Sequence, residues 1–334
     1  MKPRPSLNDV AKTLGVSAAT VSNAVSSKGR ISADLKKTIR ERAAEMGYVP
    51  SSAGRALRTG RSGFLGLVLA DIAHPLFPQI AQAIENAATD FGYGILIGDS
   101  RGDVSIQKKA IDRLIERGAD GVIIVPRHGS QVGDIGRPMA VIDSEMTPGN
   151  TVSADHRDGG KQVGKHLIEL GHRNVAIIGG FKDSNVQHDR INGVKSAFPS
   201  DAEIQTLWIE DIELEGGTGC ELGLARMVSE GVTAFVAVSD LHALRALTEL
   251  QRAGFDVPGQ VSVTGFDDLI WSNVISPTMT TVRMDMPKIA EIAVSNVIRQ
   301  INDEMTDEDR QNLSVPMTLI ARQSTGPAPT TLKN

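Results

Sequence analysis

The sequence contains a single cysteine, few aromatic residues and no long apolar segment. One cysteine, Cys220, excludes a disulfide framework and a multi-cysteine metal site, and it fits a reducing compartment. An aromatic content of 4% disfavours a surface that stacks on single-stranded nucleic acid. No apolar run approaches the roughly 20 residues that span a bilayer, and the N-terminal segment MKPRPSLNDV lacks the apolar core of a secretory signal. We therefore expect a cytoplasmic protein that is neither exported nor embedded in a membrane.

The sequence also lacks the common catalytic motifs. It has no GxSxG, no Walker A loop, no HExxH and no complete GxGxxG. The histidines are scattered without the spacing of metal ligands. Cys220 lies in GGTGCELGLARM, where apolar residues recur at helical spacing, and it is predicted to be a packed core residue. We predict that the protein is not an enzyme and holds no cofactor and no metal ion.

The charge of the chain is divided unevenly. The length of 334 residues corresponds to about two domains, and the net charge is −5. Residues 1–61 carry 12 Lys and Arg against 4 Asp and Glu, a net charge of +8, whereas the remainder carries 23 against 36, a net charge of −13. A small basic head on a large acidic body indicates that the head meets a polyanion.

The pattern over residues 6–49 predicts three short helices. The first begins after Ser6, a good N-cap, and ends at Gly15. A second follows the turn, and a third begins after Ser32 and ends at Gly47. The side chains predicted to be buried between them are Leu7, Val10, Ala11, Leu14, Val21, Ala24, Val25, Leu35, Ile39 and Ala43.

Residues 51–62, SSAGRALRTGRS, are small, basic and glycine-containing, which is typical of a linker. The segment has enough alanine and leucine to form one or two helical turns under some conditions. From Gly63 onward, apolar runs of strand length alternate with amphipathic helices, which indicates βαβ units and parallel sheets covered on both faces. The predicted strands are 64–70, 94–99, 121–126, 139–143, 174–180, 233–240 and 261–267. The predicted helices are 77–91, 104–117, 157–170, 185–197, 217–229 and 240–253. So many elements predict an α/β core of two doubly wound parallel-sheet lobes behind a small all-α head.

The strongest local pattern is LNDVAKTLGVSAATVSNAVS, residues 7–26. Two short helical patterns flank a glycine-containing turn, Ala11 is small where the helices would cross, and Val16 and Val21 supply packing between them. This spacing is typical of a helix-turn-helix, whose second helix lies in the major groove of DNA. A plain helical hairpin would show the same apolar spacing, but the basic charge of the head favours DNA binding.

With its flanking residues, this head resembles that of the lactose/galactose repressor family of bacterial transcription regulators. The resemblance extends over the whole chain, through the landmarks DIAHPLFPQIAQAIENAA (71–88), LIELGHRNVAIIGG (167–180), RINGVKSAF (190–198), TAFVAVSDLHALRALTEL (233–250), VPGQVSVTGFDD (257–268) and ARQSTG (321–326). It implies a DNA-binding head over residues 1–49, a hinge over 50–62 and a core over 63–334 that binds effector, dimerises and is similar to type I periplasmic binding proteins. Lobe 1 is expected at about 63–158 and 287–317, and lobe 2 at about 159–286 and 318–334.

The resemblance also implies which residues contact DNA. Bases would be read by Ala18, Ala19 and Asn23, and Asn23 suits adenine because an amide both donates and accepts. The two alanines either contact thymine methyl groups or merely avoid a clash. Ser17, Thr20 and Ser22 are expected to bind phosphate, with Thr20 also near the bases.

The hinge segment PSSAGRAL, residues 50–57, resembles a family segment that becomes helical on the operator. The match implies that Leu57 is a wedge in the minor groove, with Arg55 and Arg58 facing phosphate. Gly54 stands where the family usually has alanine, and glycine costs a helix about 1 kcal/mol, so this hinge should depend more strongly on DNA. The alternative is that Leu57 only packs within a linker.

Several polar side chains follow predicted strands of the core, where ligands of open α/β sheets bind. The resemblance implies that Asp143, Arg190 and Asp267 bind the effector and that Phe77 stacks on it. A second set consists of Asp71, His74, Ser184, Ser239 and Leu214, and other strand-end residues are Arg127, Asp240 and Asp268. The alternative for any one of these acids is a solvated strand end or a helix cap.

Carboxylates beside an arginine suit a polyhydroxy ligand, because adjacent hydroxyls can be bridged by two bonds. Two departures from the family pattern concern the ligand. Sugar binders often have asparagine where Ser239 stands and glutamine where Met284 stands, so amide hydrogen bonds are lost here. A less hydroxylated or a carboxylated ligand is therefore favoured over a typical aldose.

Together these features predict a ligand-responsive bacterial transcriptional regulator that acts as a repressor. We expect a homodimer on a palindromic double-stranded DNA operator, controlled by a small polar effector that is a sugar or a sugar-like metabolite. One alternative is a solute-binding or receptor protein with the same type of core, which residues 1–57 disfavour. The other is a sugar-modifying enzyme, which the missing catalytic motifs disfavour.

Overall fold

A computed structural model describes residues 5–25, 31–48, 60–126, 130, 132–306 and 311–330 of the chain. It contains two compact units, Met1–Gly63 and Phe64–Asn334, which are described separately below as the head and the core. The predicted hinge residues Arg55, Leu57 and Arg58 and the strand-end residue Arg127 lie outside the described residues. The domain and lobe boundaries given above stay a prediction.

The head consists of three helices, α1 (Leu7–Leu14), α2 (Ala18–Val25) and α3 (Ala33–Glu45). Ser6 begins α1 with a reciprocal pair of hydrogen bonds, because its hydroxyl accepts from the Asp9 N–H while the Asp9 carboxylate accepts from the Ser6 N–H. Gly15 ends α1 in the left-handed conformation, with φ of 65°. The interior is formed by the fully buried Val10, Val21, Ala24 and Ile39 with Ala11 and Ala43. The predicted three-helix head is therefore confirmed.

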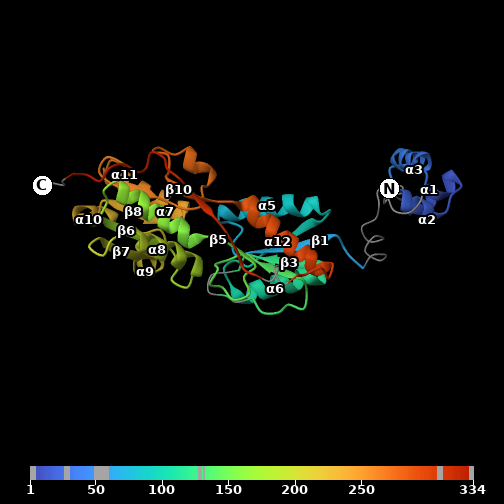
Figure 1. The fold of residues 1–334 in the computed structure, drawn as a ribbon, viewed down its shortest axis with the longest axis horizontal. Helices are drawn as coiled ribbons and strands as arrows, with labels where there is room; N and C mark the ends of the chain where they lie inside the picture. Colours follow the sequence, from blue (N-terminus) through green and yellow to red (C-terminus); the bar gives the residue numbers. More distant parts are fainter. Residues whose placement is uncertain are drawn as a thin grey trace. The chain divides into compact units, whose positions relative to one another are not determined.

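The core contains two four-stranded parallel sheets (Figure 1). The first has the order β2-β1-β3-β4 and comprises β1 (Phe64–Leu69), β2 (Gly94–Asp99), β3 (Gly121–Ile124) and β4 (Met139–Val141), with helices α5 (Leu76–Asp90) and α6 (Val104–Glu116). Its central strands β1 and β3 are almost entirely buried, because helices cover both faces of the sheet.

The second sheet has the order β7-β6-β8-β9. Its strands are β6 (Asn174–Gly179), β7 (Glu203–Trp208), β8 (Ala234–Ala237) and β9 (Ser262–Thr264). Its helices are α7 (His156–Glu169), α8 (Asn185–Ala197), α9 (Ile209–Gly216), α10 (Leu224–Ser229) and α11 (Asp240–Arg252), followed by a 3-10 turn, η1 (Ile270–Asn273). The predicted α/β core of two doubly wound parallel sheets is confirmed.

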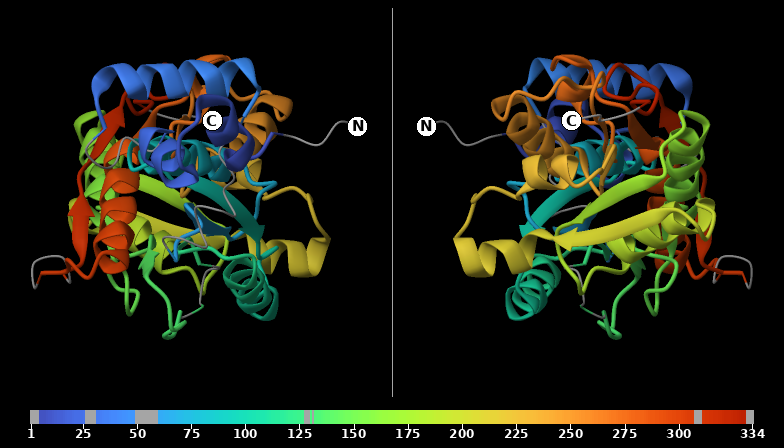
Figure 2. Two further views of the ribbon diagram at one scale, coloured as in Figure 1. Left: turned by 90° about the vertical axis from the view of Figure 1, so that its right-hand side faces the viewer. Right: turned by 90° about the vertical axis from the view of Figure 1, so that its left-hand side faces the viewer.

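Short strands near the end of the chain join the two halves. Strand β10 (Thr281–Met284) pairs antiparallel with β12 (Met317–Ile320), and β11 (Leu313–Val315) pairs parallel with β5 (Val152–Ala154). Figure 2 shows the red C-terminal strands beside the green α7 in both views. Helix α12 (Met286–Ile301) returns to pack against α5. One apolar cluster therefore runs through both halves of the core.

Two glycines allow α7 and α8 to approach closely. A Cβ added at Gly160 would lie 2.2 Å from the carbonyl oxygen of Arg190, and one added at Gly193 would lie 2.1 Å from that of Arg157. No larger residue fits either position without a shift of the backbone. This contact fixes the position of α8, the helix that carries Arg190.

The predicted helix 217–229 is wrong over its first half. Helix α9 ends at Gly216 and α10 begins only at Leu224. Between them Gly217, Gly219 and Gly223 have φ of 84°, 79° and 77°, values that glycine adopts freely and a helix excludes. Cys220 consequently lies half-buried in a loop, with its Sγ 3.5 Å from the carbonyl oxygen of Ile212, rather than on a core helix.

Candidate functional site

The predicted DNA-contacting residues of the head lie at the start of α2. Ser17 and Ala19 are exposed, whereas Ala18, Thr20, Ser22 and Asn23 are partly buried. The Ser17 hydroxyl accepts from the Thr20 N–H at 3.0 Å, so it also caps the helix. Val21 and Ala24 take the buried face. None of the predicted DNA-contacting residues is fully buried, although Ala18 packs against the apolar interior, and their contact with DNA stays a prediction.

The core contains a cavity of about 640 Å³. Eight of the nine residues predicted to bind effector line it: Asp71, His74, Phe77, Asp143, Ser184, Arg190, Ser239 and Asp267. They come from both halves of the core, at or after the ends of strands. Leu214, from the second set, does not line this cavity and is 87% exposed on α9.

A buried ion pair lies at the centre of the lining. Arg190 Nη1 is 3.0 Å from Asp267 Oδ1 and donates to the Val238 carbonyl oxygen at 2.6 Å. Its Nε donates to His156 Nδ1 at 3.3 Å, and the guanidinium lies 4.8 Å above the Phe266 ring. These contacts hold the planar group in one orientation. Burial raises the pKa of Asp267 to about 6, although the paired guanidinium opposes this rise.

The Asp267 loop has an unusual backbone. Asp267 and Asp268 have φ of 105° and 49°, a region that non-glycine residues rarely adopt. Asp240 stabilises the loop, because its carboxylate accepts from the Leu269 N–H at 2.8 Å and from the Ser272 hydroxyl at 2.6 Å. Burial raises the pKa of Asp240 to about 7, with the negative charge of Asp267 adding to the rise. Asp240 therefore supports the loop and is not part of the cavity lining.

Asp143 lies opposite, in the loop after β4. Its Oδ2 accepts from the Thr147 hydroxyl at 2.6 Å, and its backbone N–H donates to Asn150 at 2.8 Å. The Thr147 hydroxyl in turn accepts from Asn185 Nδ2, on α8, at 3.1 Å. Burial raises the pKa of Asp143 to about 6, and the nearby charge of Asp189 also raises it. Asp143 is thus linked by hydrogen bonds to the opposite half of the core.

The remaining predicted residues border the cavity from loops and helix ends. Asp71 accepts from the Ala73 N–H at 2.9 Å, and the His74 ring lies edge-on to Phe77 at 5.6 Å. Burial lowers the pKa of His74. Ser184 and Ser239 cap α8 and α11, because their hydroxyls accept from the Gln187 and His242 N–H groups.

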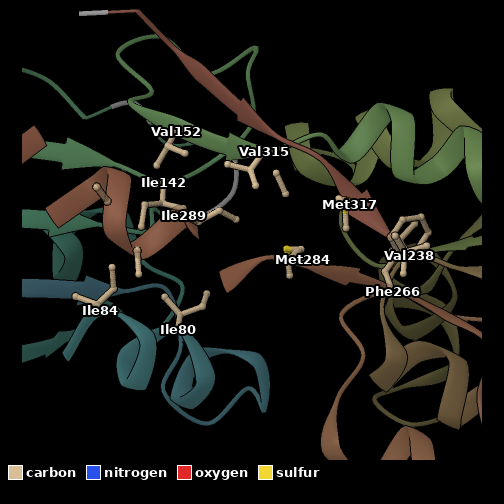
Figure 3. Packing of buried hydrophobic residues seen from close by; sticks show 14 of the residues in the cluster. Ile80, Ile84, Ile142, Val152, Val238, Phe266, Met284, Ile289, Val315 and Met317 are labelled. Carbon is tan, nitrogen blue, oxygen red and sulfur yellow. The ribbon is translucent and has the colours of Figure 1, made fainter. Parts of the chain in front are cut away.

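Part of the lining is apolar. Ile80, Ile142 and Ile289 contribute from the first half of the core, and Met284 lies on β10 between the two halves (Figure 3). Arg190 Nη2 approaches only the Met284 sulfur, at 3.9 Å, among the hydrogen-bond acceptors of the described residues. A thioether is a weak acceptor, so this guanidinium nitrogen retains donor capacity for a ligand.

Sequence reasoning missed several lining residues, above all His242. It lies on the first turn of α11, and its Nδ1 is buried with no hydrogen-bond partner among the described residues. Burial lowers its pKa to about 4, so the imidazole is neutral. Apart from apolar residues, the others include Arg101, His156, Asp183, Gln187 and Glu210. They follow no motif, because their approach depends on how the halves pack.

The described residues were also compared with the requirements of a metal site and of a membrane-spanning helix. No group of three or more His, Cys, Asp or Glu side chains among them is placed to hold a metal ion. Within the same ranges, no helix is both long and apolar enough to cross a membrane.

A helix-turn-helix head and a two-sheet core with a polar cavity define a ligand-responsive DNA-binding regulator. The family described as bacterial regulatory proteins, lacI family, matches residues 6–51, and the periplasmic binding protein-like domain matches residues 165–325. The chain thus has a lacI-family DNA-binding domain followed by a periplasmic binding protein-like domain, the pair of domains of a transcriptional regulator.

Similar proteins and a solved structure match almost the whole length of the chain. The ribose operon repressor of Halalkalibacterium halodurans is 26% identical over 324 residues, covering 96% of each chain. The transcriptional repressor PurR of Pectobacterium carotovorum is 26% identical over 336 residues, covering 97% of each. The lac repressor dimer bound to operator and the anti-inducer ONPF superimposes with a TM-score of 0.78 at 25% identity, covering 97% of this chain and all of the other.

Proposed function

We propose that the protein is a cytoplasmic repressor that binds a palindromic operator as a homodimer and responds to a small polar effector in the core cavity. The head supplies the DNA contacts through Asn23, Ala18, Ala19 and the polar residues around them. The hinge residues Arg55, Leu57 and Arg58 add minor-groove and phosphate contacts. The cavity residues bind the effector.

The observation that carries this proposal is the joining of two sites in one chain. The basic head has the capped helix-turn-helix geometry, and eight of the nine predicted effector residues line the core cavity around the Arg190–Asp267 pair. A head without a cavity would bind DNA constitutively. A cavity without a head would only bind solute.

Relatives and a structural neighbour also support a dimeric repressor. One is named as a ribose operon repressor and another as the transcriptional repressor PurR, and one structural neighbour is a dimer on its operator. One helix-turn-helix contacts too few bases for specificity, whereas two heads related by a two-fold axis match the two halves of a palindrome. This supports the dimer. Sugar-like effectors remain the expected class, because carboxylates and an arginine bind adjacent hydroxyls well.

Enrichment of genomic fragments by the purified full-length protein tests the proposal. We expect one or a few palindromic sequences to be enriched, with an affinity that falls steeply as the salt concentration rises, because the head has a net charge of +8. A solute-binding protein or a sugar-modifying enzyme would enrich no palindrome. Fragments recovered without a shared sequence would therefore contradict the proposed function.

A further inference from the structure

The Asp267 loop, residues 265–269, holds its backbone in a conformation that its residues do not favour. Asp267 and Asp268 are consecutive, and both have positive φ, 105° and 49°. Such conformations are costly for residues other than glycine and persist only where neighbouring contacts impose them. Because Asp267 lines the cavity, the contacts that impose this conformation also determine the orientation of a cavity residue.

One of these contacts is a buried ion pair formed by the second carboxylate. Asp268 Oδ1 is 2.6 Å from Arg322 Nη2, and the two side chains are only 6% and 10% exposed. Arg322 Nη1 donates to the Met279 carbonyl oxygen at 2.7 Å, so the guanidinium group is fixed from two sides. Arg283 also pairs with Asp268, at 2.6 Å, but its side chain is 55% exposed. Arg322 is therefore the partner whose charge solvent screens least.

Arg322 is itself held in place by the segment ARQSTG, residues 321–326. It lies two residues after the end of β12, and its backbone N–H donates to the Thr280 hydroxyl at 2.8 Å. In the same segment, the Ser324 hydroxyl accepts from the Thr280 N–H at 2.8 Å and donates to the Val263 carbonyl oxygen at 2.6 Å. These bonds fix Arg322 relative to β9, the strand that the Asp267 loop follows.

Asp240 supports the other end of the loop. Its carboxylate accepts from the Leu269 N–H at 2.8 Å and from the Thr281 hydroxyl at 2.6 Å. The Thr281 hydroxyl in turn accepts from the Asp268 N–H at 3.3 Å. Asp268 is thus held at its backbone by this network and at its side chain by Arg322.

The ion pair can act on a ligand only through the loop. Asp267 Oδ1 is 3.0 Å from Arg190 Nη1, whereas Asp268, the next residue, pairs with Arg322. Among the described residues that line the cavity, neither Asp268 nor Arg322 occurs. Without the ion pair, Asp268 could return to an ordinary φ, and the same change of the backbone would turn Asp267 away from Arg190.

We propose that Arg322 is a positioning residue of the cavity. Through its ion pair with Asp268 it holds the Asp267 loop at positive φ, and so it keeps Asp267 oriented toward Arg190 without contacting the effector itself. This rests on the proposed function, because it assigns a role within the same effector site. It also gives a role to the ARQSTG segment, which the structure describes throughout and which contributes no residue to the lining.

Hydrogen exchange of the loop amides tests the proposal without a ligand. The Asp267, Asp268 and Leu269 N–H groups are all hydrogen-bonded in the folded core. In the full-length Arg322→Met protein we expect these amides to exchange at least about tenfold faster, with the amides of β6 and β8 unchanged. Arg226→Met, which removes an 84% exposed arginine of α10, is the matched control and should leave the loop unchanged. Unchanged loop exchange in a folded Arg322→Met protein would overturn the proposal.

Two double variants separate the conformation of the loop from the loss of a charge. Arg322→Met/Asp268→Gly and Arg322→Met/Asp268→Ala both remove the whole ion pair, so neither leaves a lone buried charge. They differ only in that glycine adopts a φ of 49° without strain. The glycine variant should therefore keep its loop amides better protected than the alanine variant. Equal exchange in the two would show that the ion pair does not act by holding φ, and would overturn the proposal.

Calorimetry with ribose, glucose and galactose measures the consequence for binding. For each sugar that binds the wild type, Arg322→Met should lower the affinity about tenfold or more, and Arg226→Met should leave it unchanged. The glycine double variant should bind more tightly than the alanine double variant. Wild-type affinity in an Arg322→Met protein whose loop exchanges faster would show that loop orientation does not determine binding, and would also overturn the proposal.

Failure of the proposed function is seen separately. Absence of palindrome enrichment by the wild-type protein would contradict the proposed function, and absence of binding by all three sugars would contradict its sugar-like effector. Neither result alters the exchange of the loop amides, which decides in either case whether Arg322 holds the loop.

Discussion

At the scale of single residues, the buried carboxylates of the core have different roles that their sequence positions do not reveal. Asp240 and Asp267 both follow strands, yet Asp240 holds the strained loop through Ser272 and the Leu269 N–H, whereas Asp267 lines the cavity. Strand-end position predicts the candidates, because parallel strands end at a common edge. It cannot distinguish a carboxylate that holds a loop from one that binds a ligand, since this role depends on the direction in which the side chain points.

The same limit explains why His242 was missed. It lies three residues after Ser239, within the predicted helix 240–253, and nothing in that pattern marks it as a lining residue. Its ring packs against the chain around Gly180, where an added Cβ would lie 2.6 Å from Cε1 of His242. No local pattern contains that contact.

Asp240→Asn should change how stability depends on pH. Because burial raises the pKa of Asp240 from 3.8 to about 7, the unfolded chain ionises first as the pH rises, so the native state loses stability between about pH 4 and pH 7. The variant lacks this loss. We expect the wild-type protein to lose stability relative to Asp240→Asn over that range by a few kcal/mol, at about 1.4 kcal/mol per pKa unit.

Denaturant unfolding at several pH values measures this difference. Asp112→Asn, on the exposed surface of α6, is the matched control and should follow the wild-type profile. Parallel profiles for the wild type and Asp240→Asn would show that Asp240 ionises normally in the folded protein.

Asn23→Ala should weaken specific DNA binding by about 1–3 kcal/mol and leave non-specific binding almost unchanged, because a base-edge contact carries sequence information and a phosphate contact does not. Affinities for the enriched fragment and for unrelated DNA, measured in one buffer, decide this. Equal losses on both would identify Asn23 as a phosphate-binding or packing residue.

At the scale of elements, most helices and seven of the eight strands of the two parallel sheets were predictable, whereas helices α9 and α12, strand β7, the short strands that join the halves and the glycine-rich loop 217–223 were missed. Helices α5, α7, α8 and α11 agree with the prediction to within a residue or two at each end. Strands β5, β10, β11 and β12, of three or four residues each, were missed, whereas β4 and β9 are equally short but lie in the predicted strands 139–143 and 261–267. The loop 217–223 was mistaken for helix because its apolar spacing hid three glycines with positive φ.

Gly193→Ala should destabilise the core, because the new Cβ would lie 2.1 Å from the Arg157 carbonyl oxygen and force α8 away from α7. Overpacking of this kind costs about 1–3 kcal/mol, and the shift should also weaken ligand binding by displacing Arg190. Thermal unfolding and calorimetry measure the two effects.

Gly133→Ala is the matched control for this substitution. Nothing lies within 4 Å of a Cβ added there, so the stability should remain close to that of the wild type. If Gly193→Ala were as stable as this control, the close contact between α7 and α8 would not be what positions Arg190.

At the scale of the whole molecule, the sequence predicts the fold class, because alternating strand and helix patterns allow few arrangements. The charge asymmetry and the helix-turn-helix pattern lie within 61 residues and are equally visible. The full lining of the cavity is not visible, because Asp71, Asp143 and Glu210 are distant in sequence and only the packing of the two sheets brings them to one lining. Function at this scale depends on coupling between the cavity and the DNA-binding head.

That coupling is tested most directly by titrating the enriched palindromic DNA with wild-type protein and with Arg190→Met, each with and without the compound that raises the wild-type melting temperature most in a metabolite panel. We predict that the compound changes the DNA affinity of the wild type by about 5- to 150-fold, and that DNA changes the affinity for the compound by the same factor. Arg190→Met, once shown to be folded, should bind DNA like the wild type without the compound and ignore the compound. A wild-type response retained by Arg190→Met, or no response in the wild type, would contradict the account.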